Sequence, residues 1–341
     1  MTSAIGQDLR VGFWLEAFKT SGLEVSASKA VCYDCAMSIS ATHDAIQQLI
    51  SDGRYPKKKW SDSFVLDPEA LGLTLDAEDY VWRSQPDLLK VDKLKEALDL
   101  QTLCVFRAVG STNTEMLALS DSSGADRSLY TSECQVQGKG RRGRVWSSPF
   151  ARNLAFSYGH RTRHPIAGLG GLSLVVGLAV AEGINSAAKQ PVQVKWPNDI
   201  VVGERKACGI LVELSAMQDR VEAIVGVGVN VDLEEEDVAV IDRSVVDLRT
   251  LGVEETRTDL LVKLVRILQQ FLERFEAEGF AAFVGAFNDS HVYHGKTCMI
   301  HQGSQIIQGQ VEGVDDDGAL LLSTDQGIRK FHGGEVSLRA G

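Results

Sequence analysis

The stretch GKGRRGRVW, Gly138–Trp146, places four cationic side chains among three glycines in a chain whose formal net charge is −11. Glycines let backbone N–H groups approach an anion closely, and arginines add charge-assisted hydrogen bonds to carboxylate or phosphate oxygens. The spacing matches neither the phosphate loop G-x-x-x-x-G-K-[ST] nor the G-x-G-x-x-G that opens a dinucleotide-binding helix. The stretch therefore predicts a local anion site outside those two folds, with a solvated basic turn or an RGG-like nucleic-acid contact as the alternative.

The composition is that of a globular protein of 341 residues, 44% hydrophobic and 24% charged, and the length predicts two or three domains. The acidic balance argues against a protein that coats nucleic acid through its overall charge. The N-terminal residues carry charges where a signal peptide needs an apolar core, and the longest uncharged run, residues 165–181, is broken by glycines and too short for a membrane span. We therefore expect a cytoplasmic protein with no membrane partner.

Residues 1–85 read as short helices followed by extended, turn-rich sequence. The order helix, turn, helix over residues 31–53, with Thr42 as the N-cap of the second helix, is followed by a predicted hairpin with a basic tip over residues 54–68. That order is typical of a winged helix-turn-helix. Its predicted buried positions are Ile46, Leu49 and Ile50.

DNA binding by this segment is a weaker expectation than its fold. Residues 1–100 carry 11 Lys or Arg against 16 Asp or Glu, whereas DNA binding needs cations that neutralise phosphates. Lys57, Lys58 and Lys59 are the best candidates for phosphate contacts. The alternative is a small helical adaptor.

The rest of the chain divides into two further regions. From residue 100 to 285, apolar strand-like runs alternate with helical stretches, and several strands follow one another without a helix, which favours an α+β domain with a mixed sheet over a doubly wound one. From residue 292 to 341, short strands separated by Gly, Asp and Ser turns predict a small β-barrel.

Three further stretches of the middle region carry candidate site residues. KWPNDIVV, from Lys195, mounts charged and amide side chains beside a proline-fixed turn, and Lys206 precedes an apolar strand. GVGVN, residues 226–230, ends a strand with two glycines and an amide, and STN, residues 111–113, follows the first strand of the region. Taken singly, each has an ordinary structural explanation. KWPNDIVV can be a charged turn and Lys206 a surface lysine. GVGVN can be a glycine-rich central strand and STN a helix N-cap.

In their order along the chain, the stretches FRAVGSTNTEM, QVQGKGRRGRVWSSPFARNLAFS, VKWPNDIVV, RKACGILVEL and VGVGVNV closely resemble the biotin protein ligase family. The tail DDDGALLLSTDQGIRKFHGGEVSLRA is similar to that family's C-terminal SH3-like barrel. The likeness covers about residues 102 to 340. Residues 1–85 then look like the winged DNA-binding domain of the bifunctional ligase and repressor members.

The resemblance implies a two-step acyl transfer. Biotin and ATP, with Mg²⁺, give biotinyl-5′-AMP, and a lysine of the biotin carboxyl carrier protein of acetyl-CoA carboxylase then takes the biotinyl group. It also implies biotin operator DNA as a partner and a homodimer promoted by the adenylate. The alternatives are a regulator that only senses biotinyl-AMP, a ligase with a vestigial DNA-binding domain, and a lipoate ligase.

The resemblance also implies roles for individual residues, with no protein ligand to a metal among them. Arg141 and Lys206 would be catalytic, because they would neutralise charge that develops at the α-phosphate. The biotin-binding residues would be Ser111, Thr112, Asn113, Gln135, Lys139, Gly140, Arg141 and Lys206. The ATP and adenylate contacts would be Gly138, Lys195, Asp199, Gly226, Gly228 and Asn230.

Two features depart from that family's usual pattern. Lysine stands at position 139, where the family often has arginine, so backbone contacts are retained but a bidentate side-chain contact is not. The acidic segment LEEEDVAVIDRSVV, residues 233–246, lies where the family has a variable loop that covers adenine.

Overall fold

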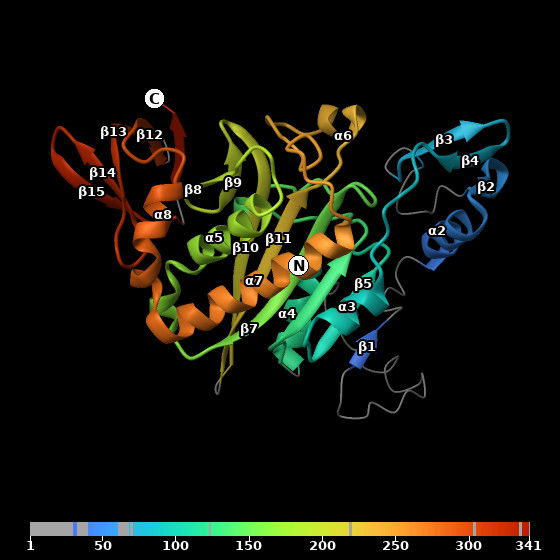
Figure 1. Ribbon diagram of the computed structural model, residues 1–341, viewed down its shortest axis with the longest axis horizontal. Coiled ribbons are helices and arrows are strands. Elements are labelled where there is room, and N and C mark those ends of the chain that lie inside the picture. Colours follow the sequence, from blue (N-terminus) through green and yellow to red (C-terminus); the bar gives the residue numbers. More distant parts are fainter. Residues whose placement is uncertain are drawn as a thin grey trace, which may run out of the picture.

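An eight-stranded mixed sheet forms the middle of the computed structural model, which describes residues 30–32, 40–60, 68, 71–122, 124–217, 220–302, 305–333 and 336–340 (Figure 1). The strand order is β1-β5-β6-β7-β11-β10-β9-β8. The first three strands run parallel, and each later pair is antiparallel. The strands are β1 (Ala30–Cys32), β5 (Thr102–Phe106), β6 (Ser128–Ser132), β7 (Asn153–Thr162), β8 (Gln193–Lys195), β9 (Asp199–Val202), β10 (Arg205–Ala216) and β11 (Val221–Asn230).

Helices cover both faces of this sheet. Val225 and Val227 of β11 belong to the large core that also contains helices α5 (Leu172–Asn185) and α7 (Arg257–Glu278). Ile224 instead packs with α4 (Thr112–Ser122). Because successive side chains of a strand point to opposite faces, Gly226 and Gly228 lie on the α4 face.

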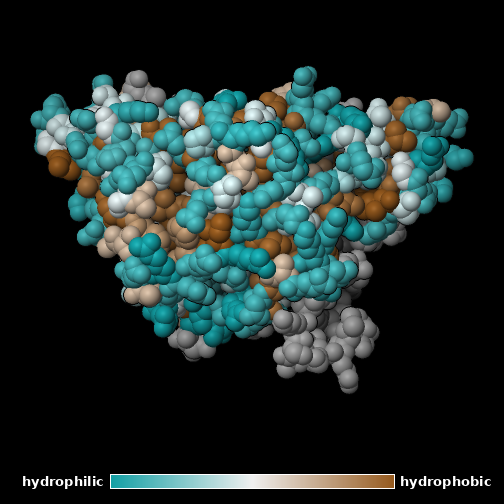
Figure 2. Space-filling model, viewed as in Figure 1, coloured by the Kyte–Doolittle hydropathy of each residue, from teal (hydrophilic) through white to brown (hydrophobic). Residues whose placement is uncertain are grey.

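The two helices of the large core form for different reasons. In α5, 11 of 14 residues are buried, so it is a core helix, and the longer segment Ile166–Asn185 is the one described helix apolar enough to cross a membrane. The helix α7 is amphipathic: the Thr256 side chain caps it by accepting from the Asp259 N–H, and Gly279, at φ 69°, ends it. The polar outer face of such elements makes the surface in Figure 2 mainly hydrophilic, with hydrophobic residues in a band across its middle.

A buried ion pair fixes the start of α7 to the sheet. The Arg257 Nη1 atom lies 2.5 Å from Glu133 Oε2, and both side chains are fully shielded from solvent. The same guanidinium donates to the backbone oxygens of Asp87 and Asn153. Because a buried charge is stable only when it is paired, replacing one of the two residues would leave the other charge unpaired and strongly destabilise the fold.

The C-terminal region packs directly against the main domain. After the turn η5 (Phe280–Phe283) and helix α8 (Val284–Ser290), strands β12 (Thr297–Gln302), β13 (Gln305–Val314), β14 (Leu320–Thr324), β15 (Gly327–Phe331) and β16 (Val336–Ala340) form an antiparallel sheet in the order β15-β14-β13-β12-β16. Its core is continuous with that of the main domain. The Trp196 indole N–H donates to the Gly318 carbonyl at 3.2 Å across the junction. The sheet is as expected, and closure into an SH3-like barrel stays a prediction.

The N-terminal region has a different local structure from the one expected. The helix α2 (Ser40–Asp52) begins before Thr42, so that residue is not its N-cap, although Ile46 and Leu49 are fully buried as predicted. Ala30–Cys32 forms a strand, not a helix, because it pairs with β5. The remaining residues of the expected first helix, 33–38, lie outside the described part.

The second half of the hairpin predicted over residues 54–68 lies outside the described part, at residues 61–67, and the first half pairs with a later strand. The strand β2 (Arg54–Pro56) pairs with β4 (Asp79–Trp82), which forms a hairpin with β3 (Leu73–Asp76), giving the order β2-β4-β3. The turn of that hairpin, residues 76–79, is acidic, and the three lysines lie in the short helix η2 (Lys57–Lys59). A helix beside a small antiparallel sheet is compatible with a winged helix-turn-helix, which stays a prediction.

Candidate active site

One pocket on the α4 face of the central sheet gathers most of the predicted site residues. It lies between the start of α4, the 138–146 stretch, β9 to β11 and the segment after β11. The predicted residues that line it are Ser111, Thr112, Asn113, Gln135, Lys139, Gly140, Arg141, Asp199, Lys206, Gly226, Gly228 and Asn230. Gly138 and Lys195 do not line this pocket.

One end of the pocket is a network of uncharged polar groups. The Gln135 Oε1 atom accepts the Thr112 backbone N–H at 2.8 Å and lies 3.2 Å from the Thr112 hydroxyl. The buried Ser157 hydroxyl lies 2.8 Å from Thr112 Oγ1 and 2.5 Å from Asn113 Oδ1. Side chains fixed in this way can read the donors and acceptors of a neutral ligand head group.

The glycines of β11 have no room for a side chain. A Cβ atom on Gly226 would lie 2.3 Å from Asn113 Oδ1, and one on Gly228 would lie 2.4 Å from the Trp146 indole. The groups that approach the backbone closely at these two glycines are therefore side chains of the protein itself. The absence of side chains at these two glycines lets Asn113 and Trp146 pack directly against the strand.

The other end of the pocket is cationic. The Lys206 Nζ atom lies 2.5 Å from Asp199 Oδ1 and 5.6 Å from the centre of the Trp146 ring. The Arg141 guanidinium donates to Asn198 Oδ1 at 3.2 Å. Burial, and to a smaller extent the charge of Arg142, lowers the pKa of Arg141, which still leaves a cation at neutral pH.

Arg141 also joins the pocket to the C-terminal sheet. Its second terminal nitrogen donates to the Gly333 carbonyl, which lies between β15 and β16. The KWPND turn contributes the other contact of the same side chain, at Asn198. Three segments far apart in the sequence therefore converge on one guanidinium.

The stretch 138–146 folds back on itself as a tight hairpin. Gly140 N–H donates to the Arg144 carbonyl at 2.7 Å, and Trp146 N–H donates to the Gly138 carbonyl at 2.9 Å. Arg142, at φ 58°, and Gly143 take the left-handed conformation that makes the turn. A Cβ atom on Gly138 would lie 2.3 Å from the Trp146 carbonyl oxygen, so the structure gives this glycine a part in the hairpin, away from the pocket.

Lys195 points away from the main pocket. Its Nζ atom lies 3.5 Å from Glu204 Oε2 and 4.9 Å from the centre of the Tyr293 ring. The residue lines an adjoining, more open pocket that also contains Arg141 and Lys206. Its predicted contact with ATP or the adenylate stays a prediction.

The acidic segment 233–246 covers part of the pocket. It contains the short helix α6 (Glu235–Ala239), whose N-terminus is closed by reciprocal contacts between Glu234 and Asp237. The segment is tied to β10, because Lys206 N–H donates to the Ser244 carbonyl at 3.0 Å. Its pocket-lining residues are Ile241, Arg243 and Val245.

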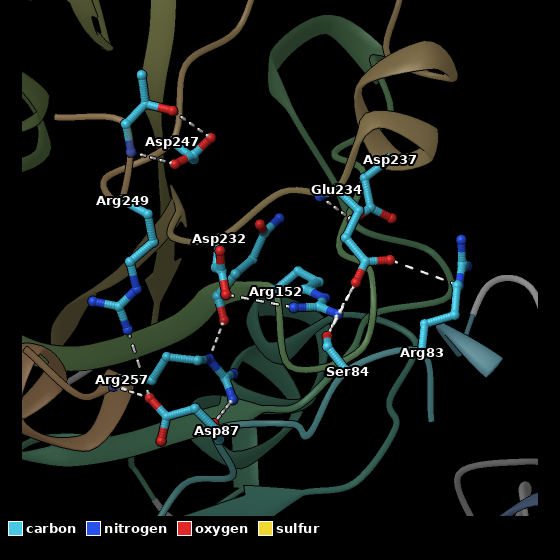
Figure 3. Close-up of polar contacts among 12 residues, drawn as sticks. Arg83, Ser84, Asp87, Arg152, Asp232, Glu234, Asp237, Asp247, Arg249 and Arg257 are labelled. Carbon is cyan, nitrogen blue, oxygen red and sulfur yellow. Dashed lines mark hydrogen bonds and ion pairs between the residues drawn. The ribbon is translucent and has the colours of Figure 1, made fainter. Parts of the chain in front are cut away.

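A polar cluster holds the start of this segment in place (Figure 3). The Glu234 carboxylate contacts Arg152, accepts from the Ser84 hydroxyl at 3.1 Å and lies 3.6 Å from the Arg83 guanidinium. Arg152 also lies 3.4 Å from Asp232. The segment that covers the pocket is thus bound to the residues that follow β4.

Several residues that build the pocket were not predicted. Trp146 stands within a motif that was recognised, but nothing in the sequence indicates that the indole packs on Gly228. Ser157 could have been found from its place opposite Gly226 in the pairing of β7 with β11. Within the described part of the chain, no group of three or more His, Cys, Asp or Glu side chains is arranged to hold a metal ion.

The fold and the pocket define a class of protein ligases. Residues 105–230 match the model of the biotin/lipoate A/B protein ligase family, and residues 293–339 match that of the biotin protein ligase C-terminal domain. The bifunctional ligase/repressor BirA of Salmonella typhimurium is 34% identical over 270 residues, which is 78% of this chain and 83% of that protein. This chain belongs to the biotin protein ligase family.

Two further proteins extend the likeness. The biotin–[acetyl-CoA-carboxylase] ligase of Paracoccus denitrificans is 29% identical over 66% of this chain and 96% of its own length. The biotin protein ligase of Aquifex aeolicus, solved in complex with biotin and ATP, superposes with a TM-score of 0.60 at 28% identity, covering 70% of this chain and 99% of that one. The superposition therefore takes in nearly the whole of that solved ligase.

Proposed function

We propose that this enzyme activates biotin with ATP to give biotinyl-5′-AMP and then transfers the biotinyl group to a lysine of the biotin carboxyl carrier protein of acetyl-CoA carboxylase. The observation that carries the proposal is one pocket with a neutral polar end at Thr112 and Asn113 and a cationic end at Arg141 and Lys206. Biotin has the same two ends, a neutral cyclic urea and a carboxylate.

The first step brings two anions together, and the cationic end of the pocket suits it. A biotin carboxylate oxygen attacks the α-phosphorus of ATP, and the bond to pyrophosphate breaks. Lys206, now paired with Asp199, and Arg141 would offset the negative charge that develops at phosphorus. Mg²⁺ bound to the phosphates of ATP would add to that neutralisation, and Asp199 offers the kind of oxygen ligand that magnesium prefers.

The second step needs the mixed anhydride to meet a lysine before it meets water. The amine of the carrier lysine attacks the biotinyl carbonyl carbon, AMP leaves with the bonding electrons, and the amine loses a proton. The 138–146 hairpin on one side and the segment 233–246 on the other would shield the adenylate until the carrier arrives.

The test is a biotinylation assay with the purified chain, biotin, MgATP and the carrier domain. The expected result is a mass increase of the carrier at its acceptor lysine, with release of pyrophosphate and AMP. A carrier whose acceptor lysine is replaced by arginine is the matched control and should stay unmodified. Formation of adenylate without carrier modification would indicate a protein that only senses biotinyl-AMP.

A second activity, repression of biotin genes, is favoured by the N-terminal region and by the bifunctional relatives. Lys57, Lys58 and Lys59 are exposed together in η2, where they can meet phosphates, although the hairpin turn at residues 76–79 is acidic. We infer weak contacts by each copy, so that binding to operator DNA would need a homodimer promoted by the adenylate. A gel shift with biotin-gene promoter DNA, with and without biotin and ATP, tests this second activity.

A further inference from the structure

Glu213 lies behind the polar end of the pocket and contacts a pocket residue without lining the pocket itself. It belongs to β10, and its Oε2 atom accepts from the Asn113 side-chain N–H at 2.8 Å. The same amide nitrogen donates to the Leu211 carbonyl at 3.2 Å. Asn113 is 96% buried, so its amide has no freedom to turn toward solvent.

The carboxylate determines which way round the Asn113 amide lies. An ionised carboxylate and a backbone carbonyl can only accept hydrogen bonds. Since Asn113 faces one of each, at Glu213 and Leu211, its NH₂ group must point toward them. Its oxygen is then left for the Ser157 hydroxyl at 2.5 Å, and an amide oxygen can only accept.

The orientation of the Asn113 amide also determines which way the hydrogen bond between Ser157 and Thr112 runs. Ser157 has a single hydroxyl proton, which is committed to Asn113, so the 2.8 Å contact between Ser157 and Thr112 must use the proton of the threonine. The alternative acceptor for that proton, Gln135 Oε1, lies farther away, at 3.2 Å, so the shorter contact to Ser157 is the favoured one. The protons therefore run from Thr112 through Ser157 and Asn113 toward Glu213.

We propose that Glu213 is a positioning residue that makes the Thr112 hydroxyl an acceptor toward the pocket, and thereby selects a ligand head group that donates an N–H. The inference rests on the proposed function, because the N–H belongs to the cyclic urea of biotin. Thr112 lines the pocket, whereas Glu213 and Ser157 do not, so the selection acts through a relay of three hydrogen bonds. Replacing the urea N–H by oxygen would set two acceptors against each other.

The test compares two ligands and three variants in the pyrophosphate-release assay. The ligands are biotin and its cyclic carbamate analogue, in which a ring oxygen replaces one N–H. The variants are Glu213→Gln, whose amide can donate as well as accept, Ser157→Ala, which interrupts the relay, and Glu182→Gln, which makes the same chemical change at an exposed position on α5. Thermal unfolding of each variant checks that it is folded.

For Glu213→Gln we expect KM for biotin to rise roughly 10-fold, kcat to stay within about twofold, and the preference for biotin over the carbamate to fall at least about 10-fold. Ser157→Ala should lose the preference similarly, and the double variant should lose no more than either single one, because both changes break the same relay. Glu182→Gln should behave as the unchanged enzyme.

Two results would overturn the inference while leaving the proposed function intact. One is a folded Glu213→Gln enzyme with unchanged preference between the two ligands. The other is fully additive losses in the double variant, which would mean that Glu213 and Ser157 act independently. If the enzyme without any substitution forms no adenylate from biotin, the proposed function itself is overturned.

Discussion

Gly226→Ala should impair biotin use by displacing one side chain. The added Cβ atom would lie 2.3 Å from Asn113 Oδ1, about 1.1 Å inside the 3.4 Å at which ordinary contacts begin. The strand β11 is paired on both sides along its length, so Asn113 is the group that must move. A shift of about 1 Å in a group that positions substrate costs on the order of 100-fold.

The expected magnitudes follow from the contacts that Asn113 would lose. We expect kcat/KM for biotin to fall roughly 100-fold, with most of the change in KM. The 2.8 Å hydrogen bond to Glu213 would be strained or lost, and a hydrogen bond to a charged group contributes about 1.5–3 kcal/mol, so the free energy of unfolding should fall by about 2 kcal/mol.

The assay measures pyrophosphate release against biotin concentration, with Gly177→Ala as the matched control. A Cβ atom on Gly177 of α5 would meet only Ile210 at 3.6 Å and Val194 at 3.7 Å, so this variant should keep its activity and gain up to about 1 kcal/mol from helix propensity. In Gly226→Ala/Asn113→Ala the loss should equal that of Asn113→Ala alone. A folded Gly226→Ala enzyme with unchanged kcat/KM would refute the reasoning.

Four further changes have expected outcomes. Arg141→Ala should fold but release biotinyl-AMP faster, as measured by retention of labelled adenylate; unchanged retention would contradict a role in holding it. Lys206→Ala should slow adenylation by about 100-fold or more and transfer from preformed biotinyl-AMP far less, so equal slowing in single-turnover assays would indicate a structural lysine. Burial, and then the charges of nearby His294, Lys195 and Lys296, lowers the pKa of His291 from 6.5 to about 3. The free energy of unfolding should therefore fall as the pH drops below 6.5, by about 2 kcal/mol at pH 5. His291→Phe should not show this loss when unfolding in urea is measured at both pH values. Neutralising all three cations of η2 should weaken promoter binding for every sequence and flatten its salt dependence, whereas loss of binding to one sequence only would point to base contacts.

The pocket could be predicted from the sequence because its parts lie in short, ordered motifs. Ser111 to Asn113 follow β5, and Lys206 is the second residue of β10, in runs whose apolar pattern is clear. In the sheet β6, β7 and β11 lie between these two strands, and the pocket brings their residues together across it. How the cover formed by residues 233–246 is held could not be predicted, because it depends on contacts of Glu234 with residues 83, 84 and 152. Those contacts join segments up to 151 residues apart and leave no local pattern.

The errors in the N-terminal region have the same origin. Ser40 and Thr42 are both suitable helix starts, and the choice between them is not decided by local capping preference. The described partner of β2 is β4, which begins 23 residues after β2 ends, and a pairing at that separation leaves no local pattern. The short strand at residues 30–32 is recognised only through its pairing with β5.

That pairing affects how the enzyme can be shortened for use as a protein-labelling reagent. Ala30, Val31 and Cys32 stand opposite Thr102, Leu103 and Cys104, at the outer end of the eight-stranded sheet. A truncated enzyme that begins after residue 85 would keep every residue that lines the pocket but lose the contacts of Arg83 and Ser84 with Glu234. It would also leave β5 as a bare edge strand, with free N–H and C=O groups on which a second molecule can assemble. Solubility on truncation therefore depends on a three-residue strand, and a shortened reagent needs either that strand or a charged substitution along β5.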